Sequence, residues 1–454
     1  MSLRLINIAR SALFAQRGAL EIIGHNTANV ETPGYVRQRP VLASIPGAIT
    51  GEAGGGVELT DIRLLRDEML ATQIRGETGT LGRERALRST LLQVEQVFTD
   101  VSAGGLALRI EEMFDAWAEL GLSATSSTCR QNVVERARLA ADTISERWHA
   151  LDNLRVEIDA RLGASVDRAN SLAAEVARIN QTIGGAAPGS ARNDLITRRE
   201  ALIGELAGLC GAEAIEQEDG IVDLVIGGRR LVEHAQVNEL RLVPDPAQPG
   251  MHLVALGQTV APDGLRGEIA GRIEARDKFI PGYMQHLDTL ATTLADEVNA
   301  LHSGGQDRAG NAGGDFFSYD ASRSAATLDV LSTIIADPGL IAAAQSDVVE
   351  SDGTNALAIN ELRNRRLFAG GTETFSGFAG ELISTIGIDA ESAQTRLDSR
   401  ELLLEGLQSA YADQAGVSLD EEALDLIRYQ QAYTAASRLM QTALDLMKAV
   451  IELT

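Results

Sequence analysis

Hydrophobic residues recur every seven positions at both ends of the chain, and this pattern predicts one long helix at each end. Residues 3–30 and residues 418–454 each carry two interleaved lines of apolar positions, which is the pattern of a coiled-coil seam. The seam positions are Ile6, Leu13, Leu20 and Ile23 in the first helix and Leu426, Tyr429, Tyr433, Met440 and Met447 in the last. At about 1.5 Å per residue, the two helices are expected to be about 40 Å and about 50 Å long.

The ends of both helices carry recognisable stop and start signals. The first helix must end before the sequence TPGY at 32–35, because a residue that precedes proline is disfavoured in the α conformation. Pro33 and Gly34 fit the two central positions of a type II turn, in which glycine supplies the positive φ. At the start of the last helix, Ser418 is the expected N-cap and Glu421 the third helical residue, which together form a capping box.

The chain between the terminal helices is predicted to form a helical body with one small β-domain. Apolar spacings of three and four indicate helices from about Asp61 to about Ile183, and again over 193–209 and 267–303. Short β-branched segments over 211–266 indicate strands. The expected hairpin turns of this β-domain are Glu218-Asp219-Gly220 and Gly227-Gly228.

These segments predict a mainly α, multidomain fold (class α+β), with the terminal helices paired as a coiled coil and a helical-bundle core. The expected units are a terminal domain from 1–50 and 405–454, a helical core from 51–210 and 267–404, and the β-domain over 211–266. Within them we expect glycine-rich loops at 51–57 and 304–315 and a mixture of short helices and turns over 322–404.

The net charge of −24 over 454 residues argues against nucleic acid or an anionic membrane as a partner, because both require clustered positive charge. Residues 1–40 carry a net charge of +3 and residues 418–454 a net charge of −3, which favours pairing of the two ends. No run of about 18 apolar residues predicts a membrane-spanning helix. The N-terminus also lacks the features of a cleaved signal peptide, so any export is expected to use another route.

The sequence contains no recognisable catalytic, metal or cofactor signature. Cys129 and Cys210 form no CxxC pair, and a disulfide between them is allowed by the sequence but not implied. His25 and Asn26 are adjacent but have no nucleophile beside them, which favours a packing role or a contact between subunits. The loop at 304–315 lacks the ligand spacing of an EF-hand, and neither a P-loop nor a GxSxG motif occurs. We therefore expect no catalytic residue, metal or cofactor.

Several sequence motifs resemble those of one known family. Asn26-Thr-Ala-Asn29 followed by Thr32-Pro33-Gly34-Tyr35 is similar to the N-terminal motif of the axial proteins of the bacterial flagellum, which are its rod, hook and hook-associated proteins. The extension through Val36-Arg37-Gln38-Arg39, the segments 193–209 and 267–317, and the last helix resemble the hook-associated members. Two departures are Thr27, where the family usually has isoleucine, and the absence of an outer β-domain after Phe317.

The resemblance implies a structural component of the flagellum that lies between hook and filament. It implies a ring-forming homo-oligomer that polymerises through both terminal helices, using the seam residues named above. The residues expected to set the geometry of the turn are Asn26, Ala28, Asn29, Thr32, Pro33, Gly34, Tyr35, Arg37 and Gln38. The implied partners are the hook protein, the second junction protein (hook-associated protein 3) and an export chaperone on the C-terminal region. The implied location is extracellular, after type III export without a cleaved signal.

Two alternatives remain open from the sequence. One is another axial protein of the flagellum, such as the hook protein. The other is a cytosolic coiled-coil scaffold, which the paired terminal seams alone would also fit.

Overall fold

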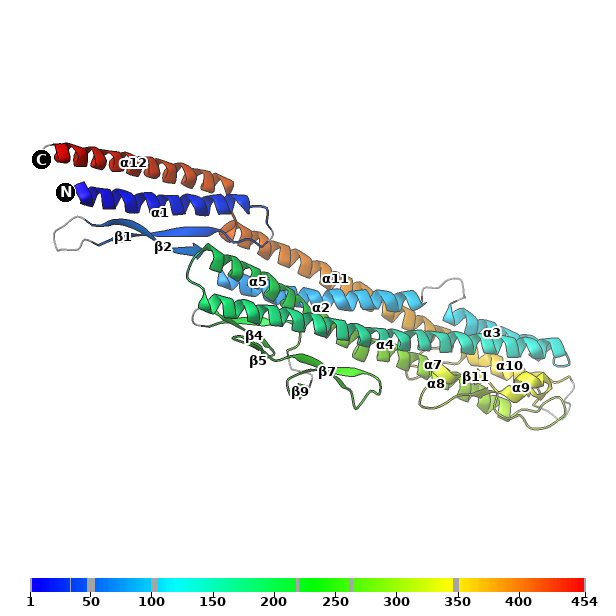
Figure 1. The fold of residues 1–454 in the computed structure, drawn as a ribbon. Coiled ribbons are helices and arrows are strands. Elements are labelled where there is room, and N and C mark those ends of the chain that lie inside the picture. The colour runs from blue at the N-terminus through cyan, green and yellow to red at the C-terminus, as the bar shows by residue number, and fades with distance from the viewer. Residues whose placement is uncertain are drawn as a thin grey trace.

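The computed structural model is an elongated molecule with both chain ends at the same end of its long axis (Figure 1). It describes residues 2–32, 34–46, 54–98, 105–217, 220–260, 264–345 and 351–452. A terminal unit is followed along the long axis by a long helical body, and a small β-domain lies on one side of the body in the half nearer the terminal unit. The mainly α fold with a small β-domain that the sequence predicts is therefore confirmed.

The terminal unit has three layers, with the N-terminal helix in the middle. Helix α1 (Ser2–Ala28) packs on one side against α12 (Leu419–Glu452) and on the other against a hairpin of β1 (Gln38–Ile45) and β2 (Gly56–Leu64). The predicted pairing of the two chain ends is confirmed. Helix α1 is covered from two sides, and its buried positions include the small side chains of Ala9, Ala15 and Ala19 as well as Ile22 and Ile23.

The β1–β2 hairpin corrects the sequence prediction, which resumed helix near Asp61. Asp61 lies in β2 and pairs with Val41, next to a β-bulge between Val41 and Leu42. Strand β2 packs directly on α1, so closely that a Cβ added at Gly18 would lie 2.9 Å from Cδ2 of Leu59. The hairpin thus forms because α1 offers it an apolar surface, which a local spacing rule does not detect.

The helical body is built on one very long helix. The main helices are α2 (Glu68–Phe98), α3 (Leu106–Leu122), α4 (Ser127–Gly185), α5 (Ser190–Cys210), α6 (Gly267–Glu274), α7 (Ile280–Ser303) and α11 (Phe375–Ala415). At about 1.5 Å per residue, α4 is about 88 Å long, and apolar residues spaced by three and four positions from Leu151 to Ile183 form its buried stripe. The aromatic core joins Trp117 to Phe316 (ring centroids 5.1 Å apart) and Phe114 to Phe375 (5.6 Å).

Helix α11 also corrects the prediction, because residues 375–415 form one continuous helix rather than short helices and turns. Its C-terminal half packs mainly on α2 and buries few apolar side chains, so its hydrophobic stripe is too thin to be read from the sequence. The helix runs from the distal body to the terminal unit (Figure 1), and the expected domain boundary at 405 therefore falls inside it. The boundary at 50/51 likewise separates the two strands of the hairpin.

The β-domain contains two antiparallel sheets that pack on α4 and α5. The first sheet consists of β3 (Glu213–Glu216), β4 (Val222–Ile226), β5 (Arg229–Glu233) and β6 (Gln236–Val237), and the second of β7 (Leu240–Pro244), β8 (His252–Leu256) and β9 (Thr259–Val260). The predicted turn at Gly227-Gly228 is confirmed, with φ values of 55° and 76°. Glu218 and Asp219 of the other predicted turn lie outside the described residues.

A buried ion pair joins the β-domain to the body. Arg276 lies in a π-helical turn (Ala275–Phe279) between α6 and α7, is fully buried, and pairs with Asp159 of α4. The other oxygen of Asp159 lies 2.7 Å from Nδ1 of His252 in β8. The sequence predicted a single helix over 267–303 and gave no sign of this π-helical insertion.

The distal end consists of short elements that follow α7. They are β10 (Phe317–Ser318), α8 (Ser324–Thr327), β11 (Asp329–Val330), α9 (Ser332–Ala336), η4 (Pro338–Leu340), α10 (Thr354–Asn360) and η5 (Glu361–Asn364). Phe317 is thus followed almost at once by helix and turn, as predicted. Among the described helices, none has a stretch both long and apolar enough to cross a membrane.

Candidate functional site

A buried polar cluster lies where the terminal unit meets the body. It combines the end of α1, the segment that leads into β1, the first turns of α12 and the N-terminal part of α5. Its central residue is Asn26, whose side chain is 1% exposed. We refer to Asn26, Tyr35, Arg37, Gln38 and Glu422 as the clasp.

Asn26 binds the backbone of the first strand from the side. Its Oδ1 accepts from the backbone N–H of Gln38 at 2.9 Å, and its Nδ2 donates to the carbonyl oxygen of Gln38 at 2.8 Å. The side-chain amide therefore makes the two hydrogen bonds that the backbone of a neighbouring strand would make at the start of β1. A second bond from Nδ2 reaches Oε2 of Glu422 at 3.2 Å, which ties the end of α1 to the start of α12.

Tyr35 completes the hydrogen bonds of Asn26. Its hydroxyl donates to Oδ1 of Asn26 at 2.8 Å and lies 3.0 Å from Nδ1 of His25. Because the hydroxyl proton is committed to Asn26, we assign Nδ1 of His25 as the donor of the second bond. Burial, followed by the negative charges of Asp194 and Glu422, raises the pKa of Tyr35, so the phenol stays protonated.

Arg37 joins the N-terminal segment to the first turns of α12 by charge. Its Nε donates to Oε1 of Glu422 at 2.6 Å, a second bond reaches Glu421, and Nη2 lies 3.7 Å from Asp425. Burial opposes the charge of Arg37, but the carboxylates of Glu421 and Glu422 outweigh it and raise its pKa. The backbone N–H of Arg37 also donates to the carbonyl oxygen of Ala415 at 3.1 Å, at the end of α11.

The turn between α1 and the clasp has the predicted geometry where it is described. Gly34 has φ = 76°, and the N–H of Tyr35 donates to the carbonyl oxygen of Thr32 at 3.1 Å. Pro33 lies outside the described residues. Asn29 donates to the carbonyl oxygen of His25 at 2.9 Å and so caps the end of α1, whose last residue, Ala28, is exposed.

The expected capping box at the start of α12 is half formed. The N–H of Glu421 lies 3.5 Å from Oγ of Ser418, as expected for an N-cap. The Glu421 side chain binds Arg37, and not the backbone of Ser418. The acidic first turn of α12 thus interacts with an arginine from the other end of the chain as well as with its own helix dipole.

The seam residues divide into two groups in the single chain. Ile23 is buried, and Ile6, Leu13, Leu20, Tyr429, Met440 and Met447 are partly buried in the terminal unit. Leu426 and Tyr433 are 36% and 39% exposed, so the predicted line through them does not face α1. The stripe of α12 that faces α1 includes Ala436 and Ala443, which lie with Tyr429 on the other of the two interleaved lines predicted for this helix. Thr27 is exposed, and its hydroxyl donates to the carbonyl oxygen of Ile23 at 2.8 Å. The polar side chain therefore does not interrupt the buried part of the seam.

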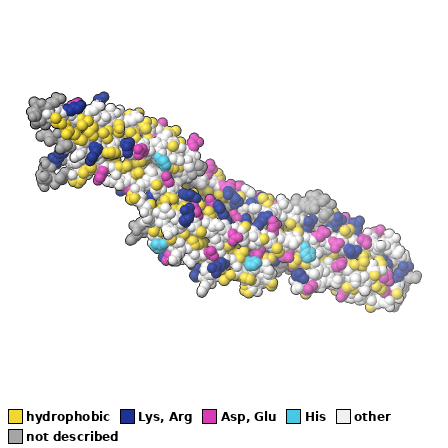
Figure 2. Space-filling view, viewed as in Figure 1, with side chains coloured by type: hydrophobic (Ala, Val, Ile, Leu, Met, Phe, Trp, Pro, Cys, Tyr) yellow, Lys and Arg dark blue, Asp and Glu magenta, His cyan; other side chains and the backbone are white. Residues whose placement is uncertain are grey.

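An exposed apolar strip runs along α12 beside the stripe that faces α1. At about 100° per residue, its members fall within about 40° of one another around the helix. They are Leu419, Leu426, Tyr433, Leu444 and Ile451, which are 36–63% exposed. We refer to these residues as the outer strip. Figure 2 shows hydrophobic side chains gathered over this end of the molecule, while charged side chains are spread over the body.

The sequence did not identify three acidic members of the site. Glu422 is 2% exposed, and Asp425 and Asp194 contribute to the same network. Asp194 Oδ1 accepts from Nε2 of Gln38 at 3.2 Å, which links the clasp to α5. One signal was present: Glu422 lies seven residues before Tyr429, on a seam line that is otherwise apolar or small. A carboxylate in such a position requires a buried partner.

The hydrogen bonds and ion pairs of the cluster join α1, α5 and α12 to the start of β1. In the part of the chain that is described, no group of three or more His, Cys, Asp or Glu residues could hold a metal ion. In the glycine-rich loop, the Asp307 carboxylate accepts from the backbone N–H groups of Ala309 and Asn311, both at 2.8 Å, and thereby stabilises a turn.

Three family models match successive parts of the chain. The model described as "Flagella basal body rod protein" matches residues 6–35, and "Flagellar basal body rod FlgEFG protein C-terminal" matches residues 408–453. The model "Flagellar hook-associated protein FlgK helical domain" matches residues 91–317, which is half of the chain. The two terminal matches contain Asn26, Tyr35 and Glu422 of the clasp, while Arg37 and Gln38 lie just outside them.

Curated relatives match along the whole chain. A protein of Bacillus subtilis named "Flagellar hook-associated protein 1" is 26% identical, with 98% of this chain and 97% of the relative aligned. The protein of the same name in Salmonella typhimurium is 24% identical over 551 aligned positions, with 99% of each chain covered. The solved "flagellar hook junction protein FlgK from Burkholderia pseudomallei" shares the fold, with a TM-score of 0.67 at 14% identity. That alignment covers 75% of this chain and 99% of the solved one.

Proposed function

The chain belongs to the flagellar hook-associated protein FlgK family, and from this premise we propose how its structure serves the bacterial flagellum. It is a structural component of the junction between hook and filament. Its work is to hold neighbouring subunits in place, and we assign it no catalytic role.

The outer strip of α12 carries the proposal. A single chain leaves leucine, tyrosine and isoleucine side chains exposed in a line along the paired terminal helices, and further apolar side chains of α12 such as Leu424 and Ile427 are exposed as well. Contiguous apolar surface of this kind marks a site of protein association. The neighbours that cover it are the terminal helices of adjacent subunits, so the chain assembles into a ring through both of its ends. The predicted contact residues Leu426 and Tyr433 lie on this strip.

The clasp fixes the direction in which the terminal helices leave the body. Its bonds join the end of α1, the start of α12 and α5, so these elements move as one block. A ring requires that every subunit present its contact surfaces at the same angle. The turn residues predicted from the sequence therefore serve the polymer by orienting the helices.

Three partners follow from the position at the junction. The ring contacts the hook protein on one side and the second junction protein, hook-associated protein 3, on the other. Before assembly, an export chaperone covers the C-terminal region, because the outer strip would otherwise promote aggregation. The subunit reaches the outside of the cell through the type III export channel without a cleaved signal.

Neither alternative function is favoured. A hook protein does not account for the match of the FlgK helical-domain model over residues 91–317. A cytosolic scaffold does not account for relatives named as hook-associated proteins over the full length.

The decisive experiment removes α12 by truncation after Gly416 and follows the protein into isolated hook–basal bodies. The full chain is expected at the end of the hook. The truncated chain is expected to keep the circular dichroism of a folded body but to be absent from the isolated structures. Truncated subunits that still enter the junction and support normal filaments would contradict the proposed role of the terminal helices. Absence of the full chain from hook–basal bodies would contradict the assignment to the junction.

A further inference from the structure

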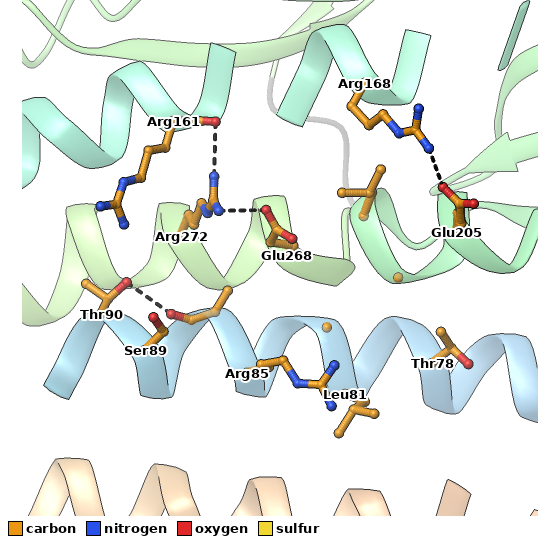
Figure 3. A pocket seen from close by; sticks show the side chains of 14 residues that line it. Thr78, Leu81, Arg85, Ser89, Thr90, Arg161, Arg168, Glu205, Glu268 and Arg272 are labelled. Atoms are coloured by element: carbon orange, nitrogen blue, oxygen red, sulfur yellow. Dashed lines mark hydrogen bonds and ion pairs between the residues drawn. The ribbon is translucent and has the colours of Figure 1, made fainter. Parts of the chain in front are cut away.

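Two hollows adjoin helix α2, and they differ in how their polar groups are satisfied. The larger, of about 440 Å³, lies between α2, α4, α5 and α6 and is drawn in Figure 3. Its arginines already have carboxylate partners in the same chain, as Arg272 has in Glu268 and Arg168 has in Glu205, both at 2.7 Å. The charges of this hollow are therefore met within the subunit, and they give no reason to expect a ligand.

The second hollow lies at the joint between the terminal unit and the body. It has a volume of about 340 Å³, and its wall is formed by α2, α5, α11 and the segments around Val36 and Leu64. This volume falls within the range of small-molecule sites, which are typically concave and mainly apolar. The apolar residues of the lining are Val36, Leu64, Ala71, Ile74, Ile196 and Ala201. We refer to this hollow as the joint hollow.

The charged groups of the joint hollow neutralise one another. Two arginines and two glutamates line it. Arg75 lies 3.0 Å from Glu200. Arg66 pairs with Glu68 and also with Glu216 of β3. A charged ligand would lose its hydration without gaining an unpaired opposite charge from this lining, so the hollow favours an uncharged ligand.

Two hydroxyl groups of the lining lack partners. Among the described residues, none forms a hydrogen bond with the hydroxyl of Tyr411 on α11. Burial raises the pKa of Tyr411, so its phenol stays protonated and can donate. The hydroxyl oxygen of Thr197 on α5 is shielded from solvent and likewise has no partner in the described part of the chain.

The missing bond of Thr197 is unusual in this chain. The helical residues Thr78 and Thr90 donate to the carbonyl oxygens four residues earlier, at 2.7 Å and 3.0 Å. A buried hydroxyl without a partner costs stability. Because no bond holds the Thr197 side chain in its rotamer, rotation about its Cα–Cβ bond can present the hydroxyl to a group in the hollow. An entering molecule with one polar group could therefore bond to Thr197 or Tyr411.

The wall of the joint hollow is connected to the clasp. Val36 precedes Arg37, and Leu64 precedes Leu65, whose N–H donates to the carbonyl oxygen of Arg37 at 2.9 Å. The opposite wall belongs to the body, through α2, α5 and α11. A molecule that fills the hollow thus contacts both units at once.

We propose that the joint hollow binds an uncharged, mainly apolar small molecule with one hydrogen-bonding group, and that this molecule stiffens the joint between the terminal unit and the body. The site goes beyond the junction function, and its occupancy does not depend on assembly of a ring. The apolar body of the ligand packs between Val36, Leu64 and Ile196, and its polar group bonds to the free hydroxyls.

The test uses benzyl alcohol, an uncharged ring with one hydroxyl, and the purified full-length chain. A titration followed by ligand-observed NMR is expected to saturate at one molecule per chain, with a dissociation constant of about 1 mM for so small a ligand. Benzoate and benzylammonium carry the same ring with a charge. They are expected to bind at least about tenfold more weakly, because nothing in the hollow compensates the lost hydration of the charge.

The location is tested by filling the hollow. Gly204 of α5 lines it, and a Cβ added at this residue would meet no other atom within 4 Å. Gly204→Leu should therefore keep the unfolding temperature but weaken binding of benzyl alcohol at least about tenfold. The control is Gly380→Leu, at an exposed glycine of α11 that has equally open surroundings outside the hollow. This variant should bind like the unmodified chain.

The polar contact is tested by removing the two free hydroxyls. Tyr411→Phe combined with Thr197→Val should weaken binding of benzyl alcohol about fivefold and leave binding of toluene unchanged. Thr78 also lines the hollow, but its hydroxyl already bonds to Ile74. Thr78→Val should therefore change the affinity for benzyl alcohol by less than about twofold.

Hydrogen exchange tests the effect on the joint. Saturating benzyl alcohol is expected to slow exchange at the amide of Leu65 and at the start of β1 at least about threefold, because the ligand stabilises the closed joint. Equal binding by Gly204→Leu and the unmodified chain, or equal binding of the charged and uncharged rings, would overturn the site. Unchanged exchange at Leu65 with the probe bound would overturn the stiffening. None of these results affects the junction function, which truncation after Gly416 tests separately.

Discussion

Arg37 and Glu422 are separated by 385 residues of sequence and lie 2.6 Å apart, Nε to Oε1. Their side chains are 12% and 3% exposed, so this bond is largely shielded from water. It joins the segment after the first helix to the first turns of the last helix. The orientation of the terminal unit therefore depends on residues that only the folded chain brings together.

Removal of Arg37 is expected to loosen the start of α12. Arg37→Ala leaves the buried carboxylate of Glu422 without its cation, and loss of one partner of a buried pair costs about 3–5 kcal/mol. Hydrogen exchange should show faster exchange in the first turns of α12 and in β1, with the distal body unchanged. Arg39→Ala, at a neighbouring exposed arginine, is the control and should change neither. Equal exchange in both variants would refute the clasp as a structural lock.

Asn26 is expected to be more sensitive than the second asparagine of the same motif. Asn26→Ala leaves the backbone N–H and carbonyl of Gln38 and the hydroxyl of Tyr35 without a buried partner. We expect a loss of about 2–3 kcal/mol in the local stability of the hairpin. Asn29→Ala removes a partly exposed helix cap and should cost about 0.5–1 kcal/mol. Hydrogen exchange of β1 amides gives both values, and a reversed order would refute this account of the motif.

An aspartate introduced into the outer strip is expected to impair assembly, whereas one introduced into the stripe of α12 that faces α1 is expected to destabilise the single chain. Leu444→Asp, at a position 46% exposed, should change the unfolding free energy of the single chain by less than about 0.5 kcal/mol but abolish entry into the flagellum. Ala443→Asp, the neighbouring residue, is fully buried against α1 and should open the helix pair in the single chain. Circular dichroism and motility assays separate the two. Normal swimming of the Leu444→Asp strain would count against the strip as an assembly surface.

His302 is expected to make the distal body sensitive to acid. Its Nδ1 donates to the carbonyl oxygen of Gly314 at 2.7 Å and its Nε2 accepts from the N–H of Ala342 at 2.9 Å, so the ring must be neutral. Burial lowers the pKa of His302 below its ordinary value of about 6.5. In the window just below that value, the unfolded chain binds more protons than the folded chain, so stability falls as pH falls.

The measurement compares urea unfolding of the unmodified chain and of His302→Gln between pH 7.5 and pH 5, a window chosen to bracket the histidine titration at about 6.5. The unmodified chain should lose more stability across this range. His149→Gln, at a partly exposed histidine, serves as the control. Parallel curves for the unmodified chain and the His302 variant would refute the assignment.

The sequence predicted those elements whose partners lie on a continuous stripe. Helices α1, α4 and α12 each bury one or two long faces, so their spacing alone located them. The hairpin and α11 were missed because few of their side chains are fully buried, and the buried residues of α11 are divided among contacts with α2, α3 and α7. The periodic pattern of hydrophobic residues reflects which side chains are buried. An element that buries few side chains therefore shows only a weak pattern in the sequence.

The candidate site was predicted only on its N-terminal side. Asn26, Tyr35, Arg37 and Gln38 were identified through a motif that resembles those of flagellar axial proteins, without knowledge of what they bind. Glu422 and Asp194 could not be assigned to them, because a polar contact between distant segments leaves no spacing in the sequence. Leu426 and Tyr433 were placed on the correct helix, but they lie on its outward side in the single chain. Whether neighbours cover them stays a prediction.

The three-layered terminal unit also has a consequence for the order of synthesis. Helix α1 and the hairpin are translated first, and α12, which covers α1, is translated last. A ribosome that stops early therefore releases a chain whose Asn26 and Arg37 have no Glu422 and whose first helix lacks its cover. Such a product lacks one of the two helices through which we propose that subunits join. Loss of the last helix would therefore remove the acidic half of the clasp and the proposed assembly surface together.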